Sequence, residues 1–345
     1  MSSKVIPIIS QLSPEKLQSI LSKMIPSREF RVLPFPGGKP GDFVRDAKLN
    51  DEVLSQIQDN EIIIADNMLI PEIAKKCPKC KWVQGTFAGL ETTFPKYREF
   101  FKDGEKPDLI GTRFSGESFG KLIADYFLSY VIAVERKFIS YRDNQSSKDW
   151  KLLRTIDTAS DIRTIGDLTV AVLGLGSIGK IVAKQFSTLG SKVISYARTD
   201  KSPEELREAG VSYHTTDVEK ALKDVDYILA ILPHTPETAG LLNGKFKVCE
   251  KKPTFINCGR GSLIGADEII KALDSNFISC AVLDVFEKEP LPSTSPLWTH
   301  PKVIITPHVS ALTGSKPLAK LFKENYDLFM DKKPLKLAID WSKDY

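Results

Sequence analysis

The sequence contains no uninterrupted apolar run of about 18 residues, the length that spans a lipid bilayer. Its first residues also lack the positively charged start and the long apolar segment of a secretory signal peptide. These absences argue against a membrane-spanning or exported protein. We therefore expect a cytoplasmic protein that has no membrane partner.

Clustered charge of one sign is absent as well. The 48 Lys and Arg residues stand against 44 Asp and Glu residues, and the formal net charge of +4 is spread along the chain. Nucleic-acid-binding proteins usually gather basic residues on one face or in one segment. The densest positive stretch, residues 75–81, is typical of a solvated helix end. We expect no nucleic-acid partner.

Cysteine and histidine are scarce, with five and four residues respectively. An odd number of cysteines, most of them in or beside apolar segments, favours reduced thiols in a reducing compartment. Cys77 and Cys80 have the spacing of a redox motif, but no second cysteine pair accompanies them. His214, His234 and His300 fall in expected loops and have no neighbour at the spacing of a zinc site. The sequence predicts neither a metal site nor thiol chemistry.

The chain is long enough for two domains, since single domains usually hold about 100 to 200 residues. From residue 166 onwards short apolar runs alternate with helical patterns, which indicates βαβ units around a parallel sheet. The first hundred residues repeat this alternation more weakly and include a helix with Ser13 as N-cap and Pro14 in its first turn. We therefore predict two α/β domains. The expected strands are residues 5–9, 31–33, 61–65, 82–84, 168–173, 193–197, 227–232, 254–256, 279–283 and 303–305.

A helix with an unusually wide apolar face is predicted between the two patterns, over residues 119–134. Such a face packs on both domains or on a second subunit, and we expect a homodimer. Residues 141–147 are polar and are predicted to form a surface loop. Helical spacing returns after residue 313.

The strand expected at residues 168–173 leads into Gly174, Gly176 and Gly179, which match G-x-G-x-x-G in its strand-to-helix context. In a dinucleotide-binding turn the first glycine permits the tight turn and the second lets the pyrophosphate approach the backbone. The third lets helix and strand pack closely. The stretch nearly matches a P-loop, but Ile181 stands where a magnesium-binding Ser or Thr is required. The pattern favours a dinucleotide over a nucleoside triphosphate.

The end of the next expected strand bears on the choice between NAD and NADP. NAD-binding proteins place an acidic side chain there, which binds the ribose 2′-hydroxyl. This chain has Ala197, Arg198 and Thr199 instead. A guanidinium beside a hydroxyl suits a 2′-phosphate, so NADP(H) is favoured and NAD(H) is the alternative. A surface arginine without a ligand is the other interpretation of Arg198.

Three polar side chains, Arg260, Glu289 and His308, each come just past the end of a predicted strand. The carboxyl ends of parallel strands meet at one edge of a sheet, so these side chains should converge. A guanidinium can bind a carboxylate and polarise a keto oxygen, although Arg260 could also serve a structural ion pair. A carboxylate bonded to an imidazole fixes which ring nitrogen carries hydrogen. The set predicts hydride transfer to a 2-oxo acid, with His308 as proton donor.

From about residue 81 to residue 313 the chain resembles the D-isomer-specific 2-hydroxyacid dehydrogenases. The motifs that carry the resemblance are residues 81–84 leading to Ala88-Gly89, the glycine loop, and residues 232–238, 257–261, 284–290 and 306–310. The resemblance implies a Rossmann dinucleotide-binding domain, residues 116–313. This domain is inserted into a smaller flavodoxin-like α/β substrate domain, residues 1–115 and 314–345, with the substrate crevice between the two.

The resemblance also assigns roles to single residues. It implies that Arg260, Glu289 and His308 are catalytic, and that the backbone amides of Ala88 and Gly89 hold the substrate carboxylate together with Arg260. Phe87 and residues 112–116 depart from the family pattern, which bears on substrate size. The implied cofactor contacts are Gly174, Gly176, Ser177, Ile178, Gly179, Arg198, Thr199, Leu232, Pro233, Thr238, Cys258 and Asp284, the last near the nicotinamide.

The sequence thus predicts an NADPH-dependent reductase that converts small 2-oxo acids into D-2-hydroxy acids, with glyoxylate and hydroxypyruvate as leading substrates. Arg198 resembles the glyoxylate and hydroxypyruvate reductases that use NADPH. Glu289 argues against a formate dehydrogenase, whose pattern has glutamine there. The alternative is a dinucleotide-sensing interaction protein, similar to the carboxyl-terminal-binding-protein corepressors, which keep this fold and these three residues.

Overall fold

The computed structural model describes residues 4–37, 44, 46–102, 105–148, 150 and 163–342. The chain forms two compact units. The terminal unit contains residues 1–116 and 313–345, and the central unit contains residues 117–312. Each unit is an α/β structure built on its own parallel sheet.

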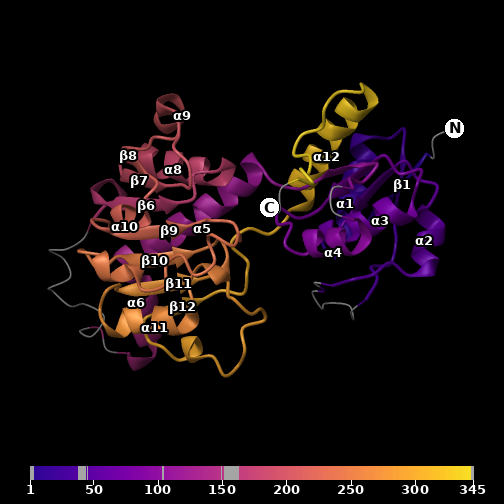
Figure 1. Ribbon diagram of the computed structural model, residues 1–345. Coiled ribbons are helices and arrows are strands. Elements are labelled where there is room, and N and C mark those ends of the chain that lie inside the picture. Colours follow the sequence, from indigo (N-terminus) through magenta and orange to yellow (C-terminus); the bar gives the residue numbers. More distant parts are fainter. Residues whose placement is uncertain are drawn as a thin grey trace. The chain divides into compact units, whose positions relative to one another are not determined.

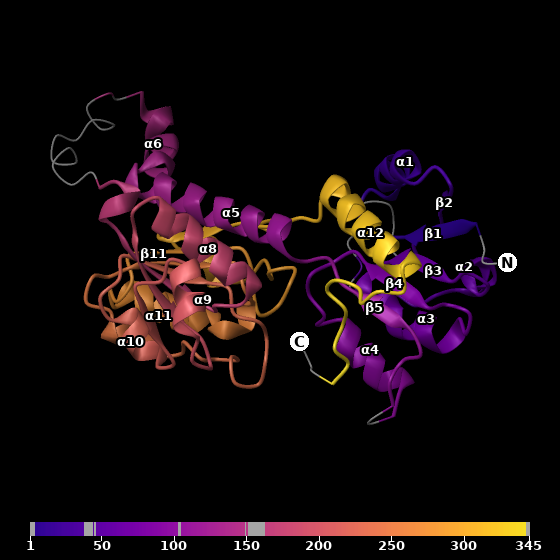
Figure 2. The ribbon, with the colours of Figure 1, turned by 90° about the horizontal axis from the view of Figure 1, so that it is seen from above.

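The terminal unit has five parallel strands: β1 (Val5–Ile9), β2 (Glu29–Val32), β3 (Ile62–Ala65), β4 (Trp82–Gly85) and β5 (Ile110–Thr112). Their order in the sheet is β2-β1-β3-β4-β5, the order of flavodoxin-like folds (Figure 1 labels β1, and Figure 2 labels all five strands). The residues of β3 are all buried, as expected for an inner strand of a parallel sheet covered on both faces. β5 was not predicted, because its three residues contain one apolar side chain beside a glycine and therefore no apolar run.

The helices of the terminal unit are α1 (Pro14–Met24), α2 (Asp51–Ile57), α3 (Ile70–Lys76), α4 (Thr93–Phe100) and α12 (Ser315–Met330). α1 begins where it was predicted, but Ser13 has a left-handed φ of 41° and its side chain makes no capping hydrogen bond. α12 packs beside α1 (Figure 2). Its Phe322 ring stacks on Trp82 of β4 with ring centroids 5.0 Å apart. The last part of the chain therefore completes the core that the first part begins.

The central unit has seven parallel strands: β6 (Thr169–Leu173), β7 (Lys192–Tyr196), β8 (Tyr213–Thr215), β9 (Tyr227–Ala230), β10 (Thr254–Asn257), β11 (Cys280–Leu283) and β12 (Val303–Ile305). Their order is β12-β11-β10-β9-β6-β7-β8. The chain runs outwards from β6 to β8 and then crosses back to β9, on the other side of β6. Open α/β sheets bind ligands where the strand order reverses in this way. This is a Rossmann arrangement, and the predicted fold class is confirmed.

The helices of the central unit are α5 (Glu117–Glu135), α6 (Phe138–Asn144), α8 (Ser177–Thr188), α9 (Pro203–Glu208), α10 (Val218–Leu222) and α11 (Ala266–Asp274). α5 and α8 lie side by side over one face of the sheet (Figure 2), where Phe127 and Phe186 are buried. Leu222 of α10 and Leu273 of α11 are buried in a second hydrophobic cluster together with Phe255 of β10. Both faces of the sheet are therefore covered, as the apolar strands require.

The surface loop predicted for residues 141–147 is wrong, since α6 continues to residue 144 and a 3-10 helix, η2 (Gln145–Ser147), follows it. Neither helix buries a residue, so the apolar periodicity that reveals a helix is missing. His214 was expected in a loop but lies in β8, where its Nδ1 is 2.8 Å from the Ser195 hydroxyl. Among the described residues, no helix is long and apolar enough to cross a membrane. The cytoplasmic location stays a prediction.

Candidate active site

The glycine loop joins β6 to α8. Gly174 has a φ of 109°, which a side chain would disfavour. A Cβ on Gly179 would lie 1.8 Å from the Gly174 carbonyl oxygen, whereas a Cβ on Gly176 would meet nothing within 4 Å. α8 starts with Ser177 and Ile178, and no described side chain caps this start. The loop thus combines close helix–strand packing, an open approach to its backbone and a helix N-terminus that suits an anion.

The segment after β7 presents Arg198 and Thr199 to solvent, and no acidic side chain stands among residues 196–199. The pKa of Glu237 is lowered, first by a hydrogen bond from Thr235 and in smaller part by the positive charge of Arg198. Arg198 therefore lies close enough to the loop after β9 to affect a charge there.

Contacts between α8 and α9 support the segment that carries Arg198. Ser202 and Glu205 form a capping box at the start of α9. Glu205 Oε1 also accepts a hydrogen bond of 2.7 Å from Lys180 Nζ in α8. This hydrogen bond is the main cause that lowers the pKa of Glu205 to about 2, so the carboxylate is ionised at neutral pH. The start of α9, just past Arg198, is thereby held to α8.

The loop after β9 contains three more of the predicted cofactor contacts. Leu232 is buried, and its Cδ2 would lie 3.3 Å from a Cβ on Gly174. The Thr238 hydroxyl donates to the Pro233 carbonyl oxygen at 2.7 Å and accepts from the Thr235 N–H at 2.8 Å. Because β9 pairs with β6, this closed turn leaves the sheet beside the glycine loop.

Arg260 follows β10 in a turn that Asn257 holds. The Asn257 side-chain oxygen accepts from the Gly259 N–H at 3.1 Å, and its Nδ2 donates to the Arg260 carbonyl oxygen at 3.0 Å. Arg260 Nη1 donates to the Gly259 carbonyl oxygen at 2.6 Å. Cys258 lies within this turn, and burial raises the pKa of its thiol well above the usual range. Any role of Cys258 at neutral pH is therefore that of a thiol, not of a thiolate nucleophile.

His308 and Glu289 are joined by a hydrogen bond of 2.8 Å between Nδ1 and Oε2. Glu289 Oε1 accepts from the Phe286 N–H at 2.9 Å, so both carboxylate oxygens have partners. An ionised carboxylate can only accept, so Nδ1 carries a hydrogen and Nε2 is left as the other ring nitrogen. The Glu289 side chain is 11% exposed and that of His308 is 45% exposed. A largely buried carboxylate thus orients an imidazole that solvent or a substrate can reach.

Asp284 fixes the segment that carries His308. Its side chain is fully buried at the end of β11 and accepts from the Val309 and Ser310 N–H groups at 2.8 and 2.9 Å. It also accepts from the Thr306 hydroxyl, which in turn lies 2.6 Å from the Tyr126 hydroxyl of α5. These contacts were not foreseen. They tie the histidine loop to β11 and α5, and the predicted nearness of Asp284 to the nicotinamide stays a prediction.

Ala88 and Gly89 belong to the terminal unit and lie, half-buried, in the turn after β4. In the same unit Cys77 and Cys80 are buried and carry free thiols. Burial is the main cause that raises the pKa of Cys77 to about 11 and that of Cys80 to about 12. Neither is a nucleophile at neutral pH. The described residues include no cluster of His, Cys, Asp or Glu side chains that could hold a metal ion.

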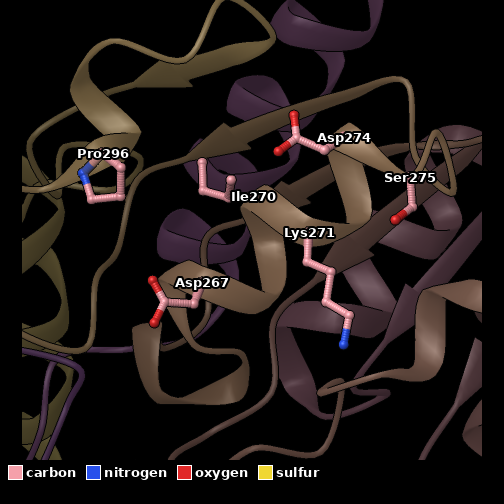
Figure 3. A pocket seen from close by; sticks show the side chains of 6 residues that line it. All are labelled: Asp267, Ile270, Lys271, Asp274, Ser275 and Pro296. Atoms are coloured by element: carbon pink, nitrogen blue, oxygen red, sulfur yellow. The ribbon is translucent and has the colours of Figure 1, made fainter.

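The described part of the central unit has two hollows. One, of about 340 Å³, lies along α11 (Figure 3), where Asp267, Lys271 and Asp274 point in different directions instead of towards one centre. The other, of about 310 Å³, lies under the segment that carries Glu289 and is mostly apolar. Arg260, Glu289 and His308 line neither of them.

The central unit is built as the nucleotide-binding part of a dehydrogenase. The model of the family "D-isomer specific 2-hydroxyacid dehydrogenase, NAD binding domain" matches residues 128–310. This match covers more than half of the chain, and the protein belongs to the D-isomer specific 2-hydroxyacid dehydrogenase family. The family predicted from the sequence is confirmed.

Known relatives agree with this membership. Over 191 residues the chain is 35% identical to glyoxylate/hydroxypyruvate reductase A of Serratia proteamaculans (strain 568), and the aligned part is 55% of this chain and 58% of that relative. The match therefore spans less than two thirds of the relative's length.

Solved structures resemble the whole chain. A family member from Aeromonas salmonicida subsp. salmonicida A449 is 28% identical with a TM-score of 0.78, and the alignment covers 99% of this chain and 100% of that one. A second, from Xanthobacter autotrophicus Py2 in complex with NADPH and MES, is 25% identical with a TM-score of 0.77 and full coverage of both chains (100% each).

Proposed function

We propose that this protein is an NADPH-dependent reductase that converts a small 2-oxo acid, with glyoxylate and hydroxypyruvate as leading candidates, into the D-2-hydroxy acid. The observation that carries the proposal is the hydrogen bond of 2.8 Å between His308 and Glu289 in the Rossmann unit. A carboxylate-oriented imidazole beside a dinucleotide fold is the equipment for a reduction in which hydride and proton reach one carbonyl group.

His308 is the proton donor of this proposal. Glu289 accepts from Nδ1, so the proton that is transferred sits on Nε2, the nitrogen that points away from the carboxylate. The protonated ring gives this proton to the carbonyl oxygen of the substrate and becomes neutral. A nicotinamide, when bound, would supply the hydride for the carbonyl carbon. The positive charge of the ring before transfer is stabilised by Glu289.

Arg260 is the group that binds and polarises the substrate. A guanidinium offers a planar fork of donors, which can hold a carboxylate and at the same time a neighbouring keto oxygen. The Asn257 side chain makes hydrogen bonds to the Gly259 N–H and to the Arg260 carbonyl oxygen and so ties down the turn that carries Arg260. We assign the substrate carboxylate to Arg260 and to the backbone amides of Ala88 and Gly89.

The glycine loop and the start of α8 are the site that we propose for the dinucleotide pyrophosphate. Arg198 and Thr199 are the groups that we propose for the 2′-phosphate of NADP(H). The relative from Xanthobacter autotrophicus was solved with NADPH, which supports this choice. NAD(H) is the weaker alternative, because residues 196–199 contain no acidic side chain that could bind the ribose 2′-hydroxyl.

Two further properties belong to the proposal. The relatives are dehydrogenases or reductases by name, which favours the enzyme over a dinucleotide-sensing interaction protein. We also propose a homodimer, because α5 and α6 expose large apolar side chains: Leu122 is 39% exposed, Ile132 37% and Phe138 53%. Sedimentation of a monomer at micromolar concentration would argue against the dimer.

The test of the function is the oxidation of NADPH and, separately, of NADH by the purified protein with a panel of small 2-oxo acids. We expect a higher kcat/KM with NADPH, and the ranking of the acids identifies the substrate. Preference for NADH would contradict the role of Arg198 but would still agree with a 2-oxo acid reductase. Tight dinucleotide binding without turnover of any acid would overturn the reductase.

A further inference from the structure

The turn after β4 in the terminal unit, residues 86–89, is held by side chains around it. Its centre contains Ala88 and Gly89, whose amides we propose to bind the substrate carboxylate. The structure shows which group shapes this turn, and the inference drawn from it rests on the proposed function.

Asn67 makes three hydrogen bonds to the turn. Its Nδ2 donates to the Phe87 carbonyl oxygen at 2.8 Å and to the Gly89 carbonyl oxygen at 2.9 Å. Its Oδ1 accepts from the Phe87 N–H at 3.2 Å. Asn67 is 1% exposed, so these bonds form away from water, where each is stronger than at the surface. One carboxamide therefore bridges the start and the end of the segment from Phe87 to Gly89.

The remaining carbonyl groups of the turn also have partners. The Thr86 carbonyl oxygen accepts from the Thr313 hydroxyl at 2.8 Å, and the Ala88 carbonyl oxygen accepts from Arg113 Nη1 at 3.4 Å. By contrast, no group among the described residues accepts from the N–H of Ala88 or of Gly89. Two consecutive amides without an acceptor, beside carbonyl groups that are all engaged, remain available to donate to an anion.

The position of Asn67 is itself fixed by its neighbours. It follows β3 and opens the 3-10 helix η1 (Asn67–Leu69). A Cβ on Gly85 would lie 2.2 Å from Asn67 Oδ1, so the carboxamide reaches the turn only because residue 85 has no side chain. Asp66, fully buried beside it, accepts from the Thr86 hydroxyl at 2.6 Å and so holds the start of the turn.

We propose that Asn67 is a positioning residue for substrate binding: its carboxamide draws the Phe87 and Gly89 carbonyl groups towards itself and thereby presents the Ala88 and Gly89 amides to the substrate carboxylate. A carboxamide suits this task because it donates and accepts at once. An aspartate at this position could accept from Phe87 but could donate to neither carbonyl oxygen.

The test compares Asn67→Ala and Asn67→Asp with the wild type. We measure KM for hydroxypyruvate, KM for NADPH, and the inhibition constant of oxamate, a carboxylate without a reducible ketone. For Asn67→Ala we expect KM for hydroxypyruvate and the inhibition constant of oxamate to rise about tenfold or more, because the Ala88 and Gly89 amides lose a hydrogen bond to the charged carboxylate of either molecule. KM for NADPH should stay within about twofold of the wild type. Asn67→Asp should raise the inhibition constant of oxamate at least as much, because the negative charge of the aspartate also repels the oxamate carboxylate.

Asn325→Ala is the matched control. Asn325 is fully buried in α12 of the same unit and also makes three hydrogen bonds, of 3.3 Å to Gln84 and of 3.1 and 2.8 Å to the Lys336 backbone. It contacts no residue of the turn by these bonds. We expect Asn325→Ala to lower the thermal stability as Asn67→Ala does, but to leave KM for hydroxypyruvate and the oxamate constant unchanged.

The outcomes separate this inference from the proposed function. If the wild type reduces no 2-oxo acid, the proposed function is overturned, and the role of Asn67 is overturned with it. A wild type that turns over hydroxypyruvate, beside Asn67 variants with unchanged KM and oxamate inhibition, overturns the inference alone. Equal changes in Asn67→Ala and Asn325→Ala would also overturn it. If Asn67→Ala does not fold, the same comparison uses Asn67→Asp, whose side chain has the same size.

Discussion

Replacing Glu289 by glutamine tests how the protein holds a charged His308. Glu289 has two partners, the Phe286 N–H at 2.9 Å and His308 Nδ1 at 2.8 Å. A glutamine has only one oxygen. If that oxygen keeps the Phe286 N–H, an NH₂ group faces the imidazole, which can then no longer donate from Nδ1. The protonated ring loses a hydrogen bond to a charged group, which is typically worth about 1.5–3 kcal/mol.

This loss corresponds to a fall in kcat/KM of about 10- to 150-fold for reduction of the 2-oxo acid. Initial rates of NADPH oxidation at a fixed, near-neutral pH measure this fall. Glu287→Gln is the control, since Glu287 is an exposed carboxylate two residues earlier in the chain. An unchanged kcat/KM for Glu289→Gln, or an equal loss for Glu287→Gln, would refute the reasoning.

Three further substitutions test other parts of the site. Arg198→Ala should raise KM for NADPH by about tenfold or more and change KM for NADH little, because only NADPH has the 2′-phosphate; equal effects on both would contradict the assignment. Arg260→Lys should lower kcat/KM by about 100-fold, since a lysine cannot form the fork, and wild-type kinetics would speak against the clamp. Tyr126→Phe removes the 2.6 Å contact with the Thr306 hydroxyl and should lower the free energy of unfolding by about 1 kcal/mol, measured by urea titration. The KM for the 2-oxo acid should change little.

The inner strands of both sheets could be predicted from the sequence because each is a continuous apolar run. β6 and β9, for example, are almost entirely buried and stand out between helical patterns. The edge strands β5 and β8 have three residues each and no such run. α6 escaped prediction because it buries no residue. Periodicity therefore reveals an element only where the element packs on a core.

The meeting of Glu289 with His308 could be predicted, because the rule for parallel strands places the ends of β11 and β12 side by side. The groups that hold them could not. Tyr126 lies 180 residues from its partner Thr306, and Asn67 lies 20 residues from Phe87. The identity of a polar residue gives no local indication of a partner far along the chain, and only the folded chain brings the two together.

The most direct test of the central claim is the initial rate of NADPH oxidation with hydroxypyruvate for the wild type and for His308→Ala. If His308 delivers the proton to the 2-oxo acid, the substitution should lower turnover by about 10²- to 10⁴-fold, the usual contribution of a general acid. The dissociation constant for NADPH, measured by fluorescence, should stay within about twofold of the wild-type value. Equal turnover in the two proteins would contradict the account.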